Sequence, residues 1–340
     1  MKRLLFIAAL SFLATPLVSM AQTTVFQDTF SGGDSLNPTT AVTPTSTTTA
    51  YEIASGKVAT TTSLTTGALK LGIASTSSGF VEAQAQFATV PITLSSLGQY
   101  AEIYVTFTDP GSFFNGNAAN NNGICVGLFN SGATPLTDGA NLWNAGLVST
   151  ETNLASGDAQ DWVGFTGNIQ YSSSATEVDT IDVRNAQTGT TNINQGLGDE
   201  SGSGVLSSLG ISGSSNEPTN PALTSGNQYT VALQIAYVDS TDDYFTESLL
   251  TGSGTGGSVI YSYGGLNAPG DVPSGYDSFD SLEVGYRDTE VPSAAQNLSI
   301  NDITVIDGTT TVVPEPATYG LVVLTMLGAV FLRRRLRTSA

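Results

Sequence analysis

Histidine is absent from this chain of 340 residues, cysteine occurs once, and lysine and arginine together number ten. Without histidine there is no Ser-His-Asp or Cys-His catalytic pair and no imidazole metal ligand. The single Cys125 excludes a zinc site built on several thiolates and a framework of internal disulfides. Nucleic acid is excluded as a partner because its binding needs many lysines and arginines. The chemistry that remains belongs to carboxylates, calcium and uncharged ligands such as sugars.

Acidic residues are concentrated between the two ends of the chain. Residues 22–312 contain 28 of the 29 acidic residues and only four basic ones, Lys57, Lys70, Arg184 and Arg287. This excess resists self-association, repels polyanions and offers oxygen ligands to hard cations. It is equally typical of a protein that stays soluble in high salt.

The first 21 residues have the parts of a secretory signal peptide. Lys2 and Arg3 form a positive start, residues 4–14 are apolar, and small residues at positions 19 and 21 precede Gln22. An apolar run of about 11 residues is too short to span a bilayer. We therefore predict a signal helix that signal peptidase removes by cleavage between Ala21 and Gln22.

The last 28 residues, 313–340, have three parts in a fixed order. Pro314, Glu315 and Pro316 come first, residues 317–332 contain no charge, and a basic tail of residues 333–340 begins with Arg333, Arg334 and Arg335. Sixteen helical residues rise about 24 Å, so 317–332 predicts a short transmembrane helix. The arginines should remain cytoplasmic, which places the acidic body outside.

This tail resembles the PEP-CTERM sorting signal of Gram-negative bacteria. The resemblance implies processing by an exosortase, a membrane enzyme of the transpeptidase kind. It also implies a bacterium that makes an extracellular polysaccharide matrix.

The body alternates apolar and polar residues with a period of two, which predicts β-strands. In 101–108, Ala101, Ile103, Val105 and Phe107 face one way. Further runs predict strands at 25–30, 68–73, 81–87, 124–129, 162–171, 230–238, 259–263, 282–286 and 298–306. In the last strand the alternation slips at Asn301 and Asp302, which predicts a β-bulge.

These strands predict an all-β fold of two antiparallel sheets packed as a sandwich. Residues 22–307 form the ectodomain and 308–312 a linker, and 38–66, 115–122 and 186–227 are predicted to be long surface loops. The body resembles the concanavalin A-like (laminin-G-like) jelly rolls in its first and last strands, Asp28-Thr29-Phe30 and residues 300–305. An immunoglobulin-like sandwich is the alternative.

Glu177, Asp179 and Asp182 are the candidate catalytic carboxylates. On a strand the first two would project from one face, about 7 Å apart. The segment resembles the Glu-x-Asp-x-x-Glu strand of laminarinase-like glucanases, which implies that Glu177 is the nucleophile and that Asp182 replaces the family's general acid. The shorter Asp182 would lie farther from a glycosidic oxygen. The alternative is a solvent-facing strand that ends in an acidic turn.

Calcium is the candidate cofactor. Asp28 on the first strand and Asp302 on the last would approach each other if the terminal strands are neighbours. Asp239, Asp242 and Asp243 offer several oxygens within five residues, although their spacing is not that of an EF-hand. A solvated acidic turn is the alternative for this loop.

Aromatic residues beside polar loops are the candidate glycan-binding groups, since rings supply apolar contact and amides supply directional hydrogen bonds. These residues are Phe113, Phe114, Trp143 and Trp162. For each tryptophan the alternative is a place in the core. Cys125, within an apolar run, is predicted to be a buried small hydrophobe.

We therefore expect an exported protein whose ectodomain is not an enzyme and acts at the cell surface or in the polysaccharide matrix, where it binds glycan. It would be anchored in the inner membrane until processing releases it to the surface or the medium. The alternative is a glycoside hydrolase or lyase of the concanavalin A-like group. Expected partners are signal peptidase, exosortase, the membrane and extracellular polysaccharide.

Overall fold

The computed structural model describes residues 20–31, 39–43, 48–49, 51–56, 63–73, 79–108, 123–132, 162–170, 180–186, 206–209, 211, 223–224, 226–268, 271–273, 276–288 and 296–310. The chain divides into two units, one of residues 22–309 and a second of residues 1–21 and 310–340. Of the second unit only residues 20, 21 and 310 are described.

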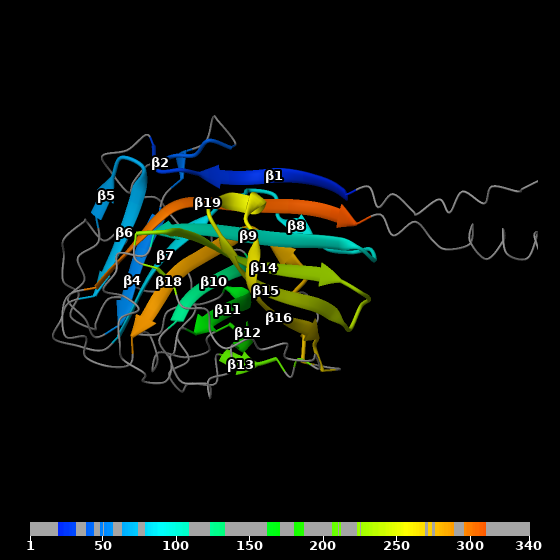
Figure 1. The fold of residues 1–340 in the computed structure, drawn as a ribbon. Coiled ribbons are helices and arrows are strands. Elements are labelled where there is room, and N and C mark those ends of the chain that lie inside the picture. The colour runs from blue at the N-terminus through cyan, green and yellow to red at the C-terminus, as the bar shows by residue number, and fades with distance from the viewer. Residues whose placement is uncertain are drawn as a thin grey trace, which may run out of the picture. The chain divides into compact units, whose positions relative to one another are not determined.

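An eight-stranded sheet forms one layer of the larger unit (Figure 1). Its strands run in the order β16, β15, β14, β9, β19, β6 and β5, and β1 also pairs with β19. Their bounds are Val259–Leu266, Asp243–Thr251, Gln228–Tyr237, Gln99–Thr108, Gln296–Thr310, Ala68–Ile73, Ser63–Thr65 and, for β1, Met20–Asp28.

A seven-stranded sheet forms the other layer, in the order β13, β12, β11, β10, β18, β7 and β4. Their bounds are Leu206–Ser208, Thr180–Arg184, Val163–Gln170, Gly123–Asn130, Ser281–Asp288, Gly79–Gln86 and Tyr51–Gly56. Two short pairs join β2 (Thr39–Thr40) to β3 (Thr48–Thr49) and β8 (Ile92–Thr93) to β17 (Ser278–Phe279). Both large sheets are antiparallel within their described registers. The predicted all-β architecture of two antiparallel sheets is confirmed.

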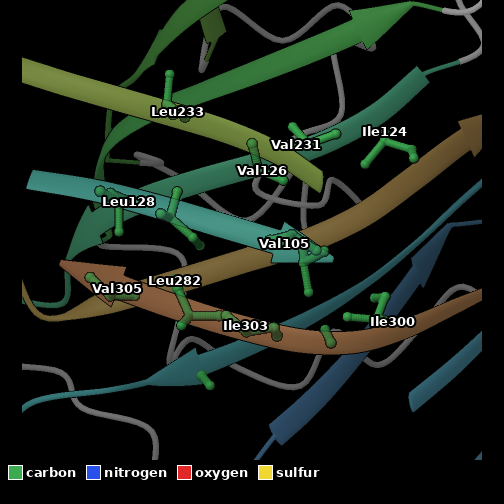
Figure 2. Close-up of a cluster of buried hydrophobic side chains, with 14 of the residues drawn as sticks. Val105, Ile124, Val126, Leu128, Val231, Leu233, Leu282, Ile300, Ile303 and Val305 are labelled. Carbon is green, nitrogen blue, oxygen red and sulfur yellow. The ribbon is translucent and has the colours of Figure 1, made fainter. Parts of the chain in front are cut away.

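The hydrophobic core lies between the two sheets. Figure 2 shows side chains of β9, β14 and β19 meeting those of β10 and β18. Val105, Val231 and Val305 come from the first sheet, and Val126 and Leu282 from the second. All five are fully buried. Alternation produces this arrangement because every second side chain of a strand points to the same face.

Every predicted strand has a counterpart, and the predicted bulge is present. The register of β19 against β9 shifts between Ile300 and Asp302, leaving Asn301 as the extra residue. Asn301 accepts a hydrogen bond from the Thr108 hydroxyl and donates one to the Gly67 carbonyl. Ile300 and Ile303 consequently both reach the core.

Three sequence predictions about the body were incomplete. The segment 38–66 is not one loop, because it contains β2, β3, β4 and β5, and 186–227 contains β13. The strand β15 was missed, since Glu247 occupies a buried position and the register shifts between Leu249 and Leu250. Both features disturb a simple alternation.

The only helix among the described residues is a short 3-10 turn, η1, at Gly254–Gly256. Within the described part of the chain no helix is long and apolar enough to cross a membrane. The predicted signal helix and the transmembrane helix at 317–332 lie outside the described residues.

Candidate functional site

The seven-stranded sheet has a second face, opposite the core, that carries polar side chains. We call this the polar face; its described residues include Glu82, Gln84, Thr166, Asn168, Asp182, Arg184 and Glu283, together with Cys125. Each alternates with a core residue of the same strand, as Glu82 does with Val81 and Ala83. Glu82 is nevertheless only 2% exposed and Glu283 0%. These polar side chains are therefore buried.

Two neighbouring strands of the polar face place an acidic corner at one side. Glu283 of β18 pairs with Gln84 of β7, and Glu82 lies two residues along the same strand. The Gln84 amide donates a hydrogen bond of 2.5 Å to a Glu82 carboxylate oxygen. Gly285, the residue opposite Glu82, leaves the necessary space, because a Cβ there would overlap the Glu82 side chain.

On the other side of the polar face lies Asn168 of β11. It pairs with Cys125 of β10, whose other neighbour is Gly285. Asn168 is 2% exposed. Neither amide atom of Asn168 has a hydrogen-bond partner in the part of the chain that the structure describes. Small residues thus separate the Asn168 side from the acidic corner.

The third part of the polar face is formed by β12. Asp182 is buried and accepts a hydrogen bond of 3.1 Å from the Thr180 hydroxyl. Arg184 donates from Nη1 to the carbonyl of Trp162. Of the predicted catalytic carboxylates, Asp182 therefore lies on this face, and Glu177 and Asp179 lie outside the described residues.

The aromatic residues predicted to bind glycan divide in the same way. Phe113, Phe114 and Trp143 lie outside the described residues. Trp162 is fully buried, and its ring packs 6.5 Å from that of Phe129. Glycan binding by Trp162 stays a prediction. Cys125 is buried, as predicted.

Asp28 and Asp302 are brought to one region because β1 pairs with β19. Burial raises the pKa of Tyr51 well above its ordinary value, and the charges of Asp28 and then Asp302 raise it further. Asp28 accepts a hydrogen bond from the amide of Phe30, and Asp302 accepts one from Gln27. Both carboxylates thus act on one buried hydroxyl.

The acidic loop between β14 and β15 is ordered by its own side chains. Asp239 accepts hydrogen bonds from the amides of Thr241 and Asp242, and these lower its pKa. Asp243 is 5% exposed, and burial followed by the charges of Asp277, Asp239 and Asp242 raises its pKa to about 7. Among the described residues no three acidic or cysteine side chains gather closely enough to hold a metal ion.

Residues 312–335 match the family model described as the PEP-CTERM protein-sorting motif. The chain carries a PEP-CTERM sorting motif. The motif implies an exported protein that is anchored at the membrane before an exosortase processes it. The motif residues themselves, including Pro314, Glu315 and Pro316 and the arginines from Arg333 to Arg335, lie outside the described residues. No curated protein matches the chain in sequence.

Solved structures similar to the body include lectins and a lyase. Peanut lectin has 11% identity and a TM-score of 0.37, over 86% of this chain and 100% of that one. The acidic lectin of winged bean, solved with methyl-α-D-galactose, has 14% identity and a TM-score of 0.36, over 86% and 100%. The marine PL-14 alginate lyase from Aplysia kurodai has 13% identity and a TM-score of 0.45, over 83% and 98%. At these identities and TM-scores the likenesses carry no argument about this chain.

Sequence reasoning missed Glu82, Gln84, Asn168 and Glu283 as site residues. They alternate with core residues, and a polar residue in that pattern carries no local sign of burial. The available signal was the neighbouring glycines: Gly123, Gly127 and Gly285 interrupt strands that are otherwise apolar. A glycine inside a strand often marks a place where another group approaches the backbone closely.

Proposed function

We propose that this protein is sorted to the cell surface or the extracellular matrix, where its β-sandwich binds glycan without catalysing a reaction. In this proposal signal peptidase cleaves between Ala21 and Gln22, residues 22–307 fold as the ectodomain, and residues 308–312 link it to the tail. Residues 308–310 of this linker continue the strand β19. The helix at 317–332 anchors the chain until exosortase acts on the motif.

The polar face is the observation that carries the glycan-binding proposal. It presents carboxylates, amides and a hydroxyl beside one another, with Cys125 and Gly285 between its two sides. Carboxylate and amide groups accept and donate the hydrogen bonds that sugar hydroxyls require. This mixture of carboxylates, amides and a hydroxyl suits the hydroxyl groups of glycans. Phosphates and nucleic acids instead need cationic side chains.

The test of this function is co-sedimentation of the full chain, purified in detergent, with insoluble polysaccharides. We expect retention on at least one polymer and no release of soluble sugar. Release of sugar would contradict the non-catalytic role. Failure to sediment with every polymer would contradict glycan binding and leave only the sorting claim.

Calcium is proposed as a cofactor at the pair Asp28 and Asp302. The pairing of β1 with β19 and the shared effect of both charges on Tyr51 support this placement. Calcium binds flexible sets of carboxylate and carbonyl oxygens and completes its shell with water. Titration of the full chain with calcium, followed by thermal unfolding, tests it: a rise in Tm that Asp302→Asn removes supports the site, and a rise that Asp302→Asn leaves unchanged contradicts it. The same titration of Asp243→Asn tests the loop of Asp239, Asp242 and Asp243.

A further inference from the structure

Asn168 differs from its polar neighbours on the polar face. Gln84 donates to Glu82, Asp182 accepts from Thr180, and Arg184 donates to a carbonyl. Asn168 is equally buried, yet among the described residues its amide oxygen and its amide nitrogen both lack a partner. A buried polar group without a partner costs about 1–3 kcal/mol, so a folded chain rarely keeps one without a reason.

A glycine makes the position of this amide possible. Gly123 lies on the neighbouring strand, and a Cβ there would overlap the Asn168 amide oxygen. Asn168 itself pairs with Cys125, two residues along β10. The amide oxygen therefore lies against the β10 backbone at Gly123, where no side chain comes between them. Two separate features of the sequence, the asparagine and the glycine, are needed to hold an unpartnered amide at this point.

The donors and acceptors of the Asn168 side chain indicate which ligand groups could form hydrogen bonds with it. An asparagine side chain offers one acceptor and two donor hydrogens. Two adjacent sugar hydroxyls can supply a donor and an acceptor at the same time. Carboxylates of the same face can accept hydrogen bonds from further hydroxyls.

The polar face carries three buried carboxyl groups against one guanidinium among its described residues, which disfavours an anionic ligand. Glu82, Glu283 and Asp182 are buried there, and two like charges in a partly buried site repel by several kcal/mol at about 4 Å. Arg184 already donates to the Trp162 carbonyl. A polyuronate or a sulfated polymer would bring its own negative charges beside these carboxylates.

We propose that Asn168 is the specificity-determining residue of a site for uncharged glycans on the polar face, where its amide hydrogen-bonds adjacent sugar hydroxyls. This inference rests on the proposed function and names its site and ligand class.

Affinity electrophoresis of the full chain in gels that contain a soluble neutral glucan, or alginate, tests this site. Asn168→Leu keeps the size of the side chain and removes its hydrogen-bonding groups. We expect it to weaken neutral-glucan retardation by about tenfold or more, as loss of a central polar contact does. We also expect an unchanged or higher Tm, because the orphan amide is gone.

Asn301→Leu is the matched control. Its amide lies on β19 of the other sheet and already has two partners, Thr108 and Gly67. The control should lower Tm and leave retardation in neutral glucan within about twofold of the wild-type value, because only the partnered amide supports the fold.

The results of the electrophoresis test the site, the ligand class and the proposed function separately. Wild-type retardation of Asn168→Leu would mean that the amide holds only an ordered water, so the site would be wrong while glycan binding stands. Stronger retardation in alginate than in neutral glucan would overturn the ligand class. Absence of retardation in every polymer would overturn the proposed function and this inference together.

Discussion

Asp243 lies at the start of β15, where its burial and the charges of Asp277, Asp239 and Asp242 raise its pKa to about 7. An unfolded aspartate has a pKa near 4. Between these values the folded state binds a proton that the unfolded state has released. The stability of the fold should therefore fall as the pH rises from about 4 to about 7 and stay level above that.

Asp243→Asn should remove this pH dependence, because an amide does not ionise. We expect the variant to be more stable than the wild type by about 2–4 kcal/mol at pH 8. Partial access of solvent to Asp243 screens its charge and favours the lower end of that range. Urea unfolding of the full chain at pH 5 and pH 8 measures it. Asp277→Asn should move the pH range over which stability falls to lower pH, because it removes one of the charges that raise the pKa of Asp243. If the stability of Asp243→Asn falls with pH as steeply as that of the wild type, another group is responsible for the pH dependence.

Gly123 is the residue that makes room for the Asn168 amide. Gly123→Ala would push its Cβ into Asn168 and against the Ile169 carbonyl. We expect a loss of about 1–3 kcal/mol in the free energy of unfolding, as for other overpacked sites. Gly256→Ala is the control, since no atom lies within 4 Å of a Cβ there. Equal losses in urea unfolding for both variants would contradict the close approach.

At the scale of single strands, the bulge in β19 corrects the phase of the last strand. Ile300 and Ile303 are both buried although they are three positions apart, an odd number, because Asn301 is the extra residue of the bulge. Deletion of Asn301 should therefore keep both side chains in the core and cost only the hydrogen bonds to Thr108 and Gly67, about 1–3 kcal/mol.

Deletion of Thr304 from the same strand is the contrasting change. It would turn Val305, which is fully buried, to the opposite face of the sheet, because side chains alternate with a period of two. We expect a loss of about 3 kcal/mol or more, the range for losing a large core side chain. Thermal unfolding of both deletions decides the point: equal losses would mean that the bulge does not set the phase.

Alternation predicted most strands because period two is a local property of the sequence. It located β9 and β14 to within about two residues, the usual uncertainty of an element's ends, and it located the bulge at Asn301. It failed where a strand breaks the pattern, as β15 does with the buried Glu247. It also failed for β4, a strand within a threonine-rich stretch.

The polar face could not be predicted in the same way. Burial of Glu82 and Glu283 depends on how β7 and β18 pair and on what covers the sheet, and neither is written in the local sequence. The proximity of Asp28 and Asp302 was predictable, because the first and last strands of such sandwiches are often neighbours. For Trp162 the sequence left two alternatives, because a tryptophan beside an acidic residue has the same local pattern in a core and in a glycan site.

At the scale of the whole molecule, the sorting motif determines where the sandwich acts. Replacing Pro314, Glu315 and Pro316 by alanine should prevent processing of the exported chain, because exosortase recognises this motif. Immunoblots of membrane and medium fractions would then show only the longer, membrane-bound form. Replacement of Asp307, which lies before the motif, by asparagine is the control. A shorter released form of the alanine variant would contradict the sorting account.

The most direct test of the central claim is hydrogen exchange of the full chain with and without a neutral polysaccharide that retains it. The account predicts added protection at the amides of β7, β10, β11, β12 and β18, the strands that carry the polar face. Protection on β14, β15 and β16 of the other sheet, or none on either sheet, would contradict it.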